Sequence, residues 1–317
     1  ARYIITDDEL VVMASESGVL PIPEARIIKK WRLQPGKMFL IDLEAGRIID
    51  DKEIKDTYAN AKPYKQWINS VRIKLSSLKG EVKEEPAKAT LLDSQQAFGY
   101  TQEDIKFLME PMAGSGEEAI GSMGNDASLA VMSNKLKPLY NYFKQLFAQV
   151  TNPPIDAIRE EIIMAEDMML GPEGNILDES PTHAHRLWIQ RPILTNEELE
   201  KIAHLNMGTL KTVTLPIVFD RDEGEAGIEK ALEKIFKKAD KAIEEGYSIF
   251  VLSDREISAK QVPIPALLAT SALHHHLIRQ GTRTKVSLVI ESGEARELHH
   301  FAVLIGYGAN AVNPYLA

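Results

Sequence analysis

The sequence predicts an α/β fold in which a β-rich beginning precedes repeated strand–helix units. The last hundred residues alternate β-branched, apolar runs with helical patterns, and these runs are hydrophobic throughout. Strands of that kind are buried on both faces, as in a parallel sheet covered by helices. The first fifty residues instead contain short strand-like runs punctuated by glycine and proline. Repeated βα units are typical of a (β/α) barrel or a doubly wound sheet, so we expect one of these architectures.

Composition excludes several classes of protein. The 317 residues are 44% hydrophobic and 26% charged, as in an ordinary globular protein. With 37 Lys and Arg against 46 Asp and Glu, the net charge of −9 argues against a nucleic-acid partner. The lack of cysteine excludes disulfides, thiolate metal sites, iron–sulfur ligation and a cysteine nucleophile. No apolar run approaches the roughly 20 residues of a membrane span, so we expect a cytoplasmic protein without a membrane partner.

The first ninety residues are predicted to form a ribbon of strands, two helices and a linker. Strands are expected at residues 3–5, 10–15, 37–42 and 47–49, the last two forming a hairpin across the turn at 44–46. Both faces of this ribbon carry apolar residues, which suggests the edge of a larger sheet. Helices are expected at residues 52–59 and from Pro63 onward, and the polar stretch 76–88 is interpreted as a surface linker.

Helical patterns dominate the middle of the chain. Thr101 is placed to cap a helix, with Asp104 in its first turn. The strongest helical period starts at Pro138 and comprises Leu139, Tyr142, Phe143, Leu146, Phe147 and Val150. It ends at residues 151–154 because proline cannot donate to a helix and disfavours helical geometry before it. A further helix is expected at residues 155–164.

The last hundred residues are predicted to alternate strands and helices. Strands are expected at residues 212–219, 248–252, 285–290 and 310–312, with helices at 225–245, 265–279 and 294–306. In such folds the functional end is the carboxyl edge of the strands.

Carboxylates follow three of these strands and would meet at that edge. One hypothesis is a free-standing βα-barrel enzyme with an acidic site in which Asp254 or Glu291 acts as the general acid or base. The alternative left open is that Asp220, Asp254 and Glu291 simply lie where acidic and polar residues cap the following helices.

Five of the eight histidines lie in two clusters, at residues 274–276 and 299–300. Consecutive helical side chains point about 100° apart, and no carboxylate stands at metal-ligand spacing, so no metal site is predicted. We expect these histidines at a helix–helix seam or facing another domain.

Neither a phosphate loop nor a catalytic triad is predicted. The glycines at 114, 116, 121 and 124 lack the Lys-Ser/Thr of a Walker loop and the preceding strand of a dinucleotide site. A mobile loop or a close approach of backbone fits this stretch better. No Gly-x-Ser-x-Gly elbow follows a strand.

Several runs resemble the central domain of the glutamate synthase large (alpha) subunit. The most specific is FKQLFAQVTNPPID at residues 143–156, and others are GSMGND at 121–126, RPILTN at 191–196 and ALHHHLIR at 272–279. The run GYGANAVNPYLA at 306–317 is similar to the junction into that enzyme's FMN domain. LQPGKM at 33–38 and GRIID at 46–50 resemble the last strands of its N-terminal glutaminase domain. Residues 124–128 read GNDAS where the family pattern is Gly-Asp-Asp-Thr-Pro, so Asn125 replaces its first carboxylate.

The resemblance implies a parent enzyme that converts glutamine, 2-oxoglutarate and a reductant into two glutamates. Residues 1–70 would end a class II glutamine amidotransferase domain of the N-terminal-nucleophile type, 71–90 would be a linker, and 91–317 a central domain resembling a degenerate (β/α) barrel. The parent is expected to use FMN and an iron–sulfur cluster, with no cofactor, metal or catalytic residue in this segment. Its partners would be the flanking glutaminase and FMN-binding synthase domains, with a small NADPH-oxidising subunit or ferredoxin supplying electrons.

The resemblance also implies that the central domain lines part of an internal ammonia tunnel. A tunnel wall must exclude water so that ammonia stays unprotonated, and short side chains with free carbonyls suit that purpose. Thr151 and Asn152, released from helical geometry by the two prolines that follow, are the residues expected to line it. The alternative left open is a tight interhelical turn.

Overall fold

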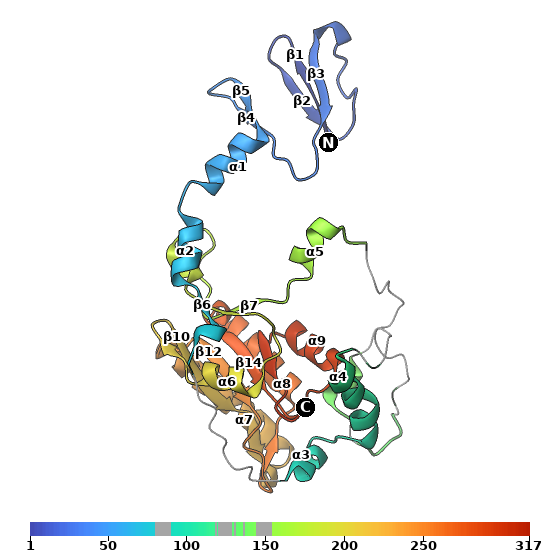
Figure 1. The fold of residues 1–317 in the computed structure, drawn as a ribbon, viewed down its shortest axis with the longest axis vertical. Helices are drawn as coiled ribbons and strands as arrows, with labels where there is room; N and C mark the ends of the chain where they lie inside the picture. Colours follow the sequence, from blue (N-terminus) through green and yellow to red (C-terminus); the bar gives the residue numbers. More distant parts are fainter. Residues whose placement is uncertain (80–89, 118, 120–128, 130, 136, 144–153) are drawn as a thin grey trace. The chain divides into compact units, whose positions relative to one another are not determined.

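The computed structural model describes residues 1–79, 90–117, 119, 129, 131–135, 137–143 and 154–317 (Figure 1). The chain divides into two compact units, Ala1–Trp67 and Ile68–Ala317, and each is described here by itself. Both contain strands and helices, so the predicted mixed α/β class is confirmed. No helix within the described ranges is long and apolar enough to cross a membrane.

A three-stranded antiparallel sheet opens the first unit. The strand β1 (Arg2–Thr6) lies between β2 (Val11–Ala14) and β3 (Ile27–Arg32). The strands β1 and β2 were expected, whereas β3 was not. Its sequence, Ile-Ile-Lys-Lys-Trp-Arg, is mostly charged and exposed, so it lacks the alternation that identifies a half-buried strand.

The hairpin and helices that follow agree with the sequence patterns. The strands β4 (Leu40–Asp42) and β5 (Arg47–Ile49) pair across a turn in which Asp42 accepts hydrogen bonds from the backbone N–H groups of residues 44 and 45. Helix α1 (Asp51–Ala59) begins after Asp50, whose side chain accepts from the N–H of Lys52. Helix α2 comprises Tyr64–Val71.

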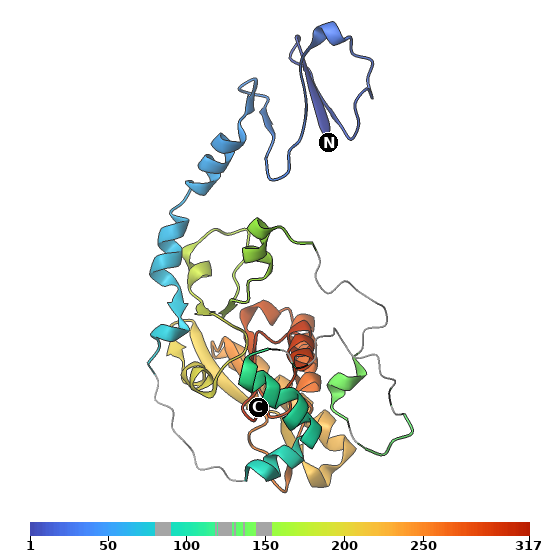
Figure 2. The same cartoon turned by 45° about the vertical axis from the view of Figure 1, so that its right-hand side comes forward.

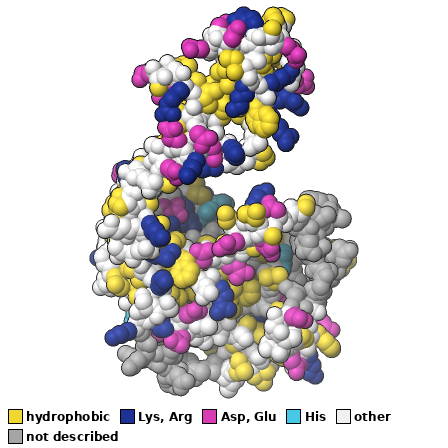
Figure 3. Space-filling model, turned by 45° about the horizontal axis from the view of Figure 1, so that its top comes forward, with side chains coloured by type: hydrophobic (Ala, Val, Ile, Leu, Met, Phe, Trp, Pro, Cys, Tyr) yellow, Lys and Arg dark blue, Asp and Glu magenta, His cyan; other side chains and the backbone are white. Residues whose placement is uncertain are grey.

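The first unit has a small core. Within residues 1–67, Tyr3 and Ile54 are the buried hydrophobic side chains, and the Tyr3 ring packs on Phe39 at 4.5 Å between centroids. On its visible face, Figure 3 shows hydrophobic side chains among charged ones. The exposed large apolar residues of this unit are Leu10, Met13, Val19, Leu20, Ile28, Trp31, Met38, Leu40, Leu43 and Tyr58. The apolar side chains of the predicted ribbon are therefore largely exposed in this unit.

A mostly parallel sheet forms the centre of the second unit. Its order is β15 (Ala311–Asn313), β14 (Ser287–Glu291), β12 (Ile249–Ser253), β10 (Leu210–Pro216) and β9 (Asn206–Met207). The pairs β10–β12, β12–β14 and β14–β15 are parallel, as predicted, and β9 is antiparallel to β10. Among the described residues this sheet is open, so a barrel-like closure is not confirmed.

Alternating side chains of the sheet bury two separate hydrophobic clusters. Phe250 and Leu252 face a layer made by the helices α7 (Glu225–Glu244), α8 (Ala266–Arg279) and α9 (Leu298–Gly306). Ile249 and Val251 face the other layer, which contains α6 (Asn196–Ala203) and a small sheet. Strands buried on both faces explain why their sequences are apolar throughout. Figure 1 shows these helices around the strands.

The described part of the second unit also contains two small sheets. One has the order β6 (Ile73–Lys74), β8 (Leu187–Ile189), β7 (Met168–Leu170), and the other pairs β11 (Val218–Asp220) with β13 (Gln261–Pro263). The predicted strand 212–219 is thus divided, because the chain leaves the main sheet after Ile217, whose N–H still donates to the carbonyl of Ser253.

Residues 90–115 form helices before the glycine-rich stretch. Helix α3 (Leu91–Ala97) precedes a π-helical segment (Asp104–Met109) that continues into α4 (Glu110–Ser115). The predicted cap at Thr101 is confirmed, because its hydroxyl accepts from the N–H of Asp104 at 3.1 Å. Helix α5 (Ala157–Ile163) lies within the predicted range.

The helix predicted to start at Pro138 is wrong over its described part. Residues Leu139–Tyr142 form a 3-10 turn, Phe143 is extended, and residues 144–150 lie outside the described ranges. Tyr140 is fully buried whereas Tyr142 is 58% exposed, the reverse of what the helical period requires. A tertiary contact of Tyr140 with α9 explains the difference.

Candidate functional site

The carboxyl edge of the parallel sheet brings the predicted carboxylates together. Asp254 follows β12 directly, and Glu291 is the last residue of β14. The N–H of Asp254 donates to the carbonyl of Glu291 at 3.2 Å, and the hydroxyl of Ser253 donates to the Glu291 carboxylate at 2.5 Å. The strand ends alone were sufficient to predict this meeting of Asp254 and Glu291.

Asp254 is held by the loop that follows β14. Its carboxyl group accepts from the hydroxyl of Ser292 at 2.6 Å and from the N–H of Gly293 at 3.1 Å, and it also interacts with the hydroxyl of Tyr315. Burial raises the pKa of Asp254 to about 7, and these hydrogen bonds oppose that rise. Asp254 therefore ties two loops together and does not cap a helix. The capping interpretation does hold for Asp220, whose side chain accepts from the N–H of Asp222.

Glu291 is engaged just as fully. The Nε of Arg255 donates to its carboxylate, and the same guanidinium lies 4.1 Å from the centroid of the Tyr315 ring. Arg255 also contacts the amide oxygen of Asn196 at 3.4 Å. Both carboxylates are thus occupied by partners within the chain, an arrangement suited to holding loops in place.

A segment near the start of the second unit covers this edge, and no sequence pattern indicated it. The hydroxyl of Tyr100 donates to the carbonyl of Gly293 at 2.9 Å. Arg296 donates to the carbonyls of Phe98 and Gly99, each at 3.2 Å. A Cβ on Gly293 would lie 2.5 Å from the Phe98 ring, so only glycine permits this approach.

The histidines take separate structural positions. His276 on α8 lies 3.0 Å from Asp240 and stacks on Phe236 of α7, so it occupies the predicted helix–helix seam. His274 accepts from Arg283, and His300 stacks on the ring of Tyr140. Among the described side chains, no group of three His, Asp or Glu is placed to hold a metal ion.

Other predicted positions fall largely outside the described ranges. Thr151 and Asn152, proposed for the tunnel wall, are among them, as are Gly121 and Gly124. Gly114 lies within α4, and Gly116 ends that helix with φ of 69°, a conformation that favours glycine.

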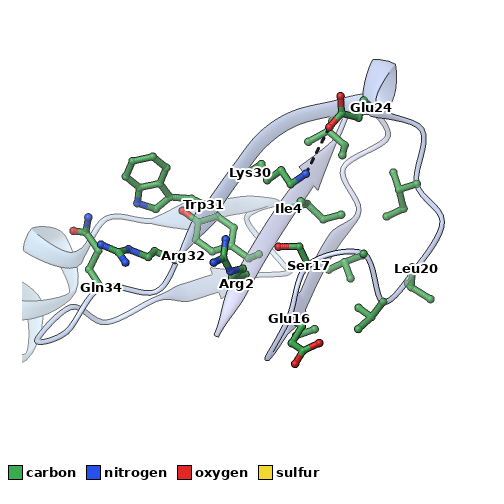
Figure 4. Close-up of a pocket in the computed structure, with 17 residues that line it drawn as sticks. Arg2, Ile4, Glu16, Ser17, Leu20, Glu24, Lys30, Trp31, Arg32 and Gln34 are labelled. Atoms are coloured by element: carbon green, nitrogen blue, oxygen red, sulfur yellow. Dashed lines mark ion pairs between the residues drawn. The ribbon is translucent and has the colours of Figure 1, made fainter.

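The first unit contains a hollow of about 430 Å³ beside its three-stranded sheet (Figure 4). Ile4 and Leu20 contribute apolar surface, and Arg2 and Arg32 contribute positive charge. Lys30 is 3.6 Å from Glu24 at its border. An apolar floor with a charged border is typical of a surface that packs against further protein.

Comparison with known proteins identifies both units. Residues 93–317 match the family described as glutamate synthase central domain. The chain belongs to this family. Residues 1–67 match the family of class-II glutamine amidotransferases, so the glutamate synthase central domain is preceded here by part of an amidotransferase domain.

Glutamate synthases from distant organisms align with the whole chain. The glutamate synthase [NADPH] large chain of Bacillus subtilis is 47% identical over 317 residues, and the glutamate synthase [NADH] of Schizosaccharomyces pombe is 43% identical over 328 residues. The ferredoxin-dependent, chloroplastic glutamate synthase of Spinacia oleracea is 42% identical over 320 residues. Each alignment covers 100% of this chain but only 20%, 16% and 20% of the respective relative.

The residues that the structure describes do not fit the cofactors that a glutamate synthase implies. An iron–sulfur cluster is held by cysteine thiolates, and this chain has no cysteine. A flavin would be expected at the carboxyl edge of a parallel sheet. In this chain the polar groups at that edge, those of Asp254, Arg296 and Tyr100, form hydrogen bonds with the neighbouring loops of the chain instead. No chemical step is therefore assigned to either group in this segment.

Proposed function

We propose that this chain is the connecting part of a glutamate synthase, the enzyme that makes two glutamates from glutamine, 2-oxoglutarate and a reductant. The observation that carries the proposal is the succession of two family matches, amidotransferase and then central domain, along one chain. Residues 1–70 would end the glutaminase domain, 71–90 would connect, and 91–317 would form the central domain. The partners would be the flanking glutaminase and FMN-binding synthase domains, with electrons supplied by an NADPH-oxidising subunit or ferredoxin.

The proposed role of the chain is to hold the two reaction centres apart without making bonds itself. The carboxylates at the sheet edge support this role, because Asp254 and Glu291 both accept hydrogen bonds from groups within the chain. The exposed apolar surface of the first unit also supports it, because such a surface packs against further protein. The parallel strands with their connecting helices are consistent with a degenerate (β/α) barrel as their origin.

The second part of the proposal is that the central domain lines the ammonia path at Thr151 and Asn152. Ammonia must travel unprotonated, so its path needs a wall without charges and without bulk water. The sequence Thr-Asn-Pro-Pro supplies short uncharged side chains and carbonyls that proline prevents from entering a helix.

The test measures the coupling of the two half-reactions in a glutamate synthase polypeptide that contains this chain. Thr151→Phe narrows the proposed path, so glutamine hydrolysis should exceed 2-oxoglutarate consumption. Thr151→Val keeps the volume of the side chain and serves as the matched control. In this variant one glutamine should still be hydrolysed for each 2-oxoglutarate consumed. An unchanged ratio for Thr151→Phe would remove Thr151 from the path.

A binding measurement tests the non-catalytic role separately. Calorimetry of this chain with FMN, glutamine and 2-oxoglutarate should show no saturable binding. Tight binding of any of them, or glutamine turnover by the chain alone, would favour an enzyme with its acidic site at Asp254 and Glu291 instead.

A further inference from the structure

The two ends of the central domain meet at one place, the carboxyl edge of the parallel sheet. Phe98 lies near the start of the family match and Tyr315 near its end, yet their rings pack edge to face at 6.4 Å between centroids, with an angle of 83°. Figures 1 and 2 both show the C-terminus beside the helices that span residues 91–115. Phe98 and Tyr315 are distant in sequence, and they are in contact because both pack at the carboxyl edge of the sheet.

A continuous set of hydrogen bonds connects these two ends. The hydroxyl of Tyr100 donates to the carbonyl of Gly293, and the N–H of Gly293 donates to Asp254. Asp254 in turn interacts with the hydroxyl of Tyr315. Each link joins groups that are buried or half-buried, where a lost partner is costly because water does not replace it.

Arg296 makes a second connection from the same loop. Its side chain is 4% exposed and donates to the carbonyls of Phe98 and Gly99. Its guanidinium also lies 3.1 Å from the carboxylate of Asp104 and 4.3 Å from the centroid of the Tyr100 ring. A buried guanidinium with several partners fixes their geometry, because a planar fork of donors tolerates little displacement.

We propose that Phe98, Tyr100, Asp254, Gly293, Arg296 and Tyr315 form a terminal clasp, whose positioning residues lock the two ends of the central domain together and so keep glutaminase and synthase activities coupled. This inference rests on the function proposed above. A domain whose ends are locked transmits movement of one neighbour to the other as a rigid body, whereas free ends would absorb it.

The first experiment uses this chain and asks whether the clasp holds residues 91–104. Tyr100→Phe and Tyr315→Phe each remove one hydroxyl, and Tyr142→Phe removes one at an exposed position outside the clasp. Hydrogen exchange of amides 91–104 should be about five- to tenfold faster in the two clasp variants. It should match the wild type in Tyr142→Phe. Equal exchange in all four proteins would overturn the clasp.

The second experiment uses a glutamate synthase polypeptide that contains this chain. The clasp variants should lower the 2-oxoglutarate consumed per glutamine hydrolysed by about twofold or more, because a mobile connection between the two domains no longer holds the reaction centres in their productive arrangement. Tyr142→Phe should keep the wild-type ratio. Faster exchange with an unchanged ratio would show that the clasp is only structural and would overturn its coupling role.

The two proposals fail in different ways. If the wild-type polypeptide shows no coupled reaction, the proposed function fails and the coupling role fails with it. If the wild type is coupled and Thr151→Phe uncouples it while the clasp variants do not, the proposed function stands and the clasp alone is refuted. Because Tyr→Phe changes preserve the rings, loss of folding is not expected, and circular dichroism of each variant checks this.

Discussion

The ring of His300 lies flat on the ring of Tyr140, with their centroids 4.3 Å apart and their planes inclined by 19°. Both side chains are buried, at 3% and 0% exposure. The contact joins α9 to the 3-10 turn at Leu139–Tyr142. Burial, with a smaller effect of Arg296, lowers the pKa of His300 to about 3, so the imidazole is neutral in the folded protein.

The lowered pKa of His300 predicts that the folded protein loses stability in acid. The unfolded chain binds a proton at His300 below its ordinary pKa of 6.5, whereas the folded chain does so only near 3. Stability should therefore fall as the pH drops below 6.5, by roughly 5 kcal/mol at the lower limit. In urea titrations, His300→Phe, which keeps a stacking ring, should lose this acid dependence. If the free energy of unfolding depends on pH equally in the variant and the wild type, the assignment to His300 is contradicted.

Asp254 should act in the opposite direction. Its pKa is about 7 in the folded protein against 3.8 ordinarily, so the fold binds the proton more tightly. The stabilisation is complete below 3.8 and is lost as the pH rises to about 7, by roughly 4 kcal/mol. Asp254→Asn should remove this part of the pH dependence, whereas Asp220→Asn, at the cap of a 3-10 turn away from Asp254, should leave it in place. Burial also raises the pKa of Glu294, which adds its own pH dependence. The contribution of Asp254 is therefore the difference in unfolding free energy between the variant and the wild type at each pH.

Gly308 and Gly306 provide a matched pair of substitutions at the end of α9. Gly308 has φ of 113°, and a Cβ there would collide with the ring of His274. Gly308→Ala should therefore lower the free energy of unfolding by about 2–4 kcal/mol. Gly306 is helical with open space around it, so Gly306→Ala should raise stability by about 0.5–1 kcal/mol. Thermal unfolding measures both changes, and equal shifts would contradict the steric argument.

The first unit should be less stable than the second when the chain is studied alone. Tyr3 and Ile54 are its buried hydrophobic side chains, whereas every residue of β12 and β14 is buried. Amide hydrogens of β1 and β3 should thus exchange far faster than those of β12, because local opening there exposes little apolar surface. Comparable protection in β1 and β12 would show that the ribbon needs no further covering.

Local patterns were sufficient to predict most of the second unit. The strands β12 and β14 were predicted because they are apolar on both faces, and α7 because its apolar residues recur at helical spacing. The meeting of Asp254 and Glu291 followed from parallel strands, whose carboxyl ends share one edge. These features depend on residues close together in sequence.

The predictions that failed concern features that depend on contacts between residues far apart in sequence. The strand β3 is paired through its backbone while its side chains remain exposed, so its residue types did not reveal it. The period from Pro138 predicted a helix, but packing of Tyr140 on His300, 160 positions away, selects a 3-10 turn. Tertiary contacts override a local preference because burying one aromatic side chain outweighs the small propensity differences of a few residues.

The sequence by itself determined the family, the alternation of strands and helices, and the lack of any thiol chemistry. Only the tertiary structure decided that Phe98, Tyr100 and Arg296 close the sheet edge and that Asp254 faces Tyr315. The physical reason is that a hydrogen bond between residues about 200 positions apart produces no recurring pattern of residue types in the sequence. Such contacts arise only once burial of the sheet has brought the two ends together.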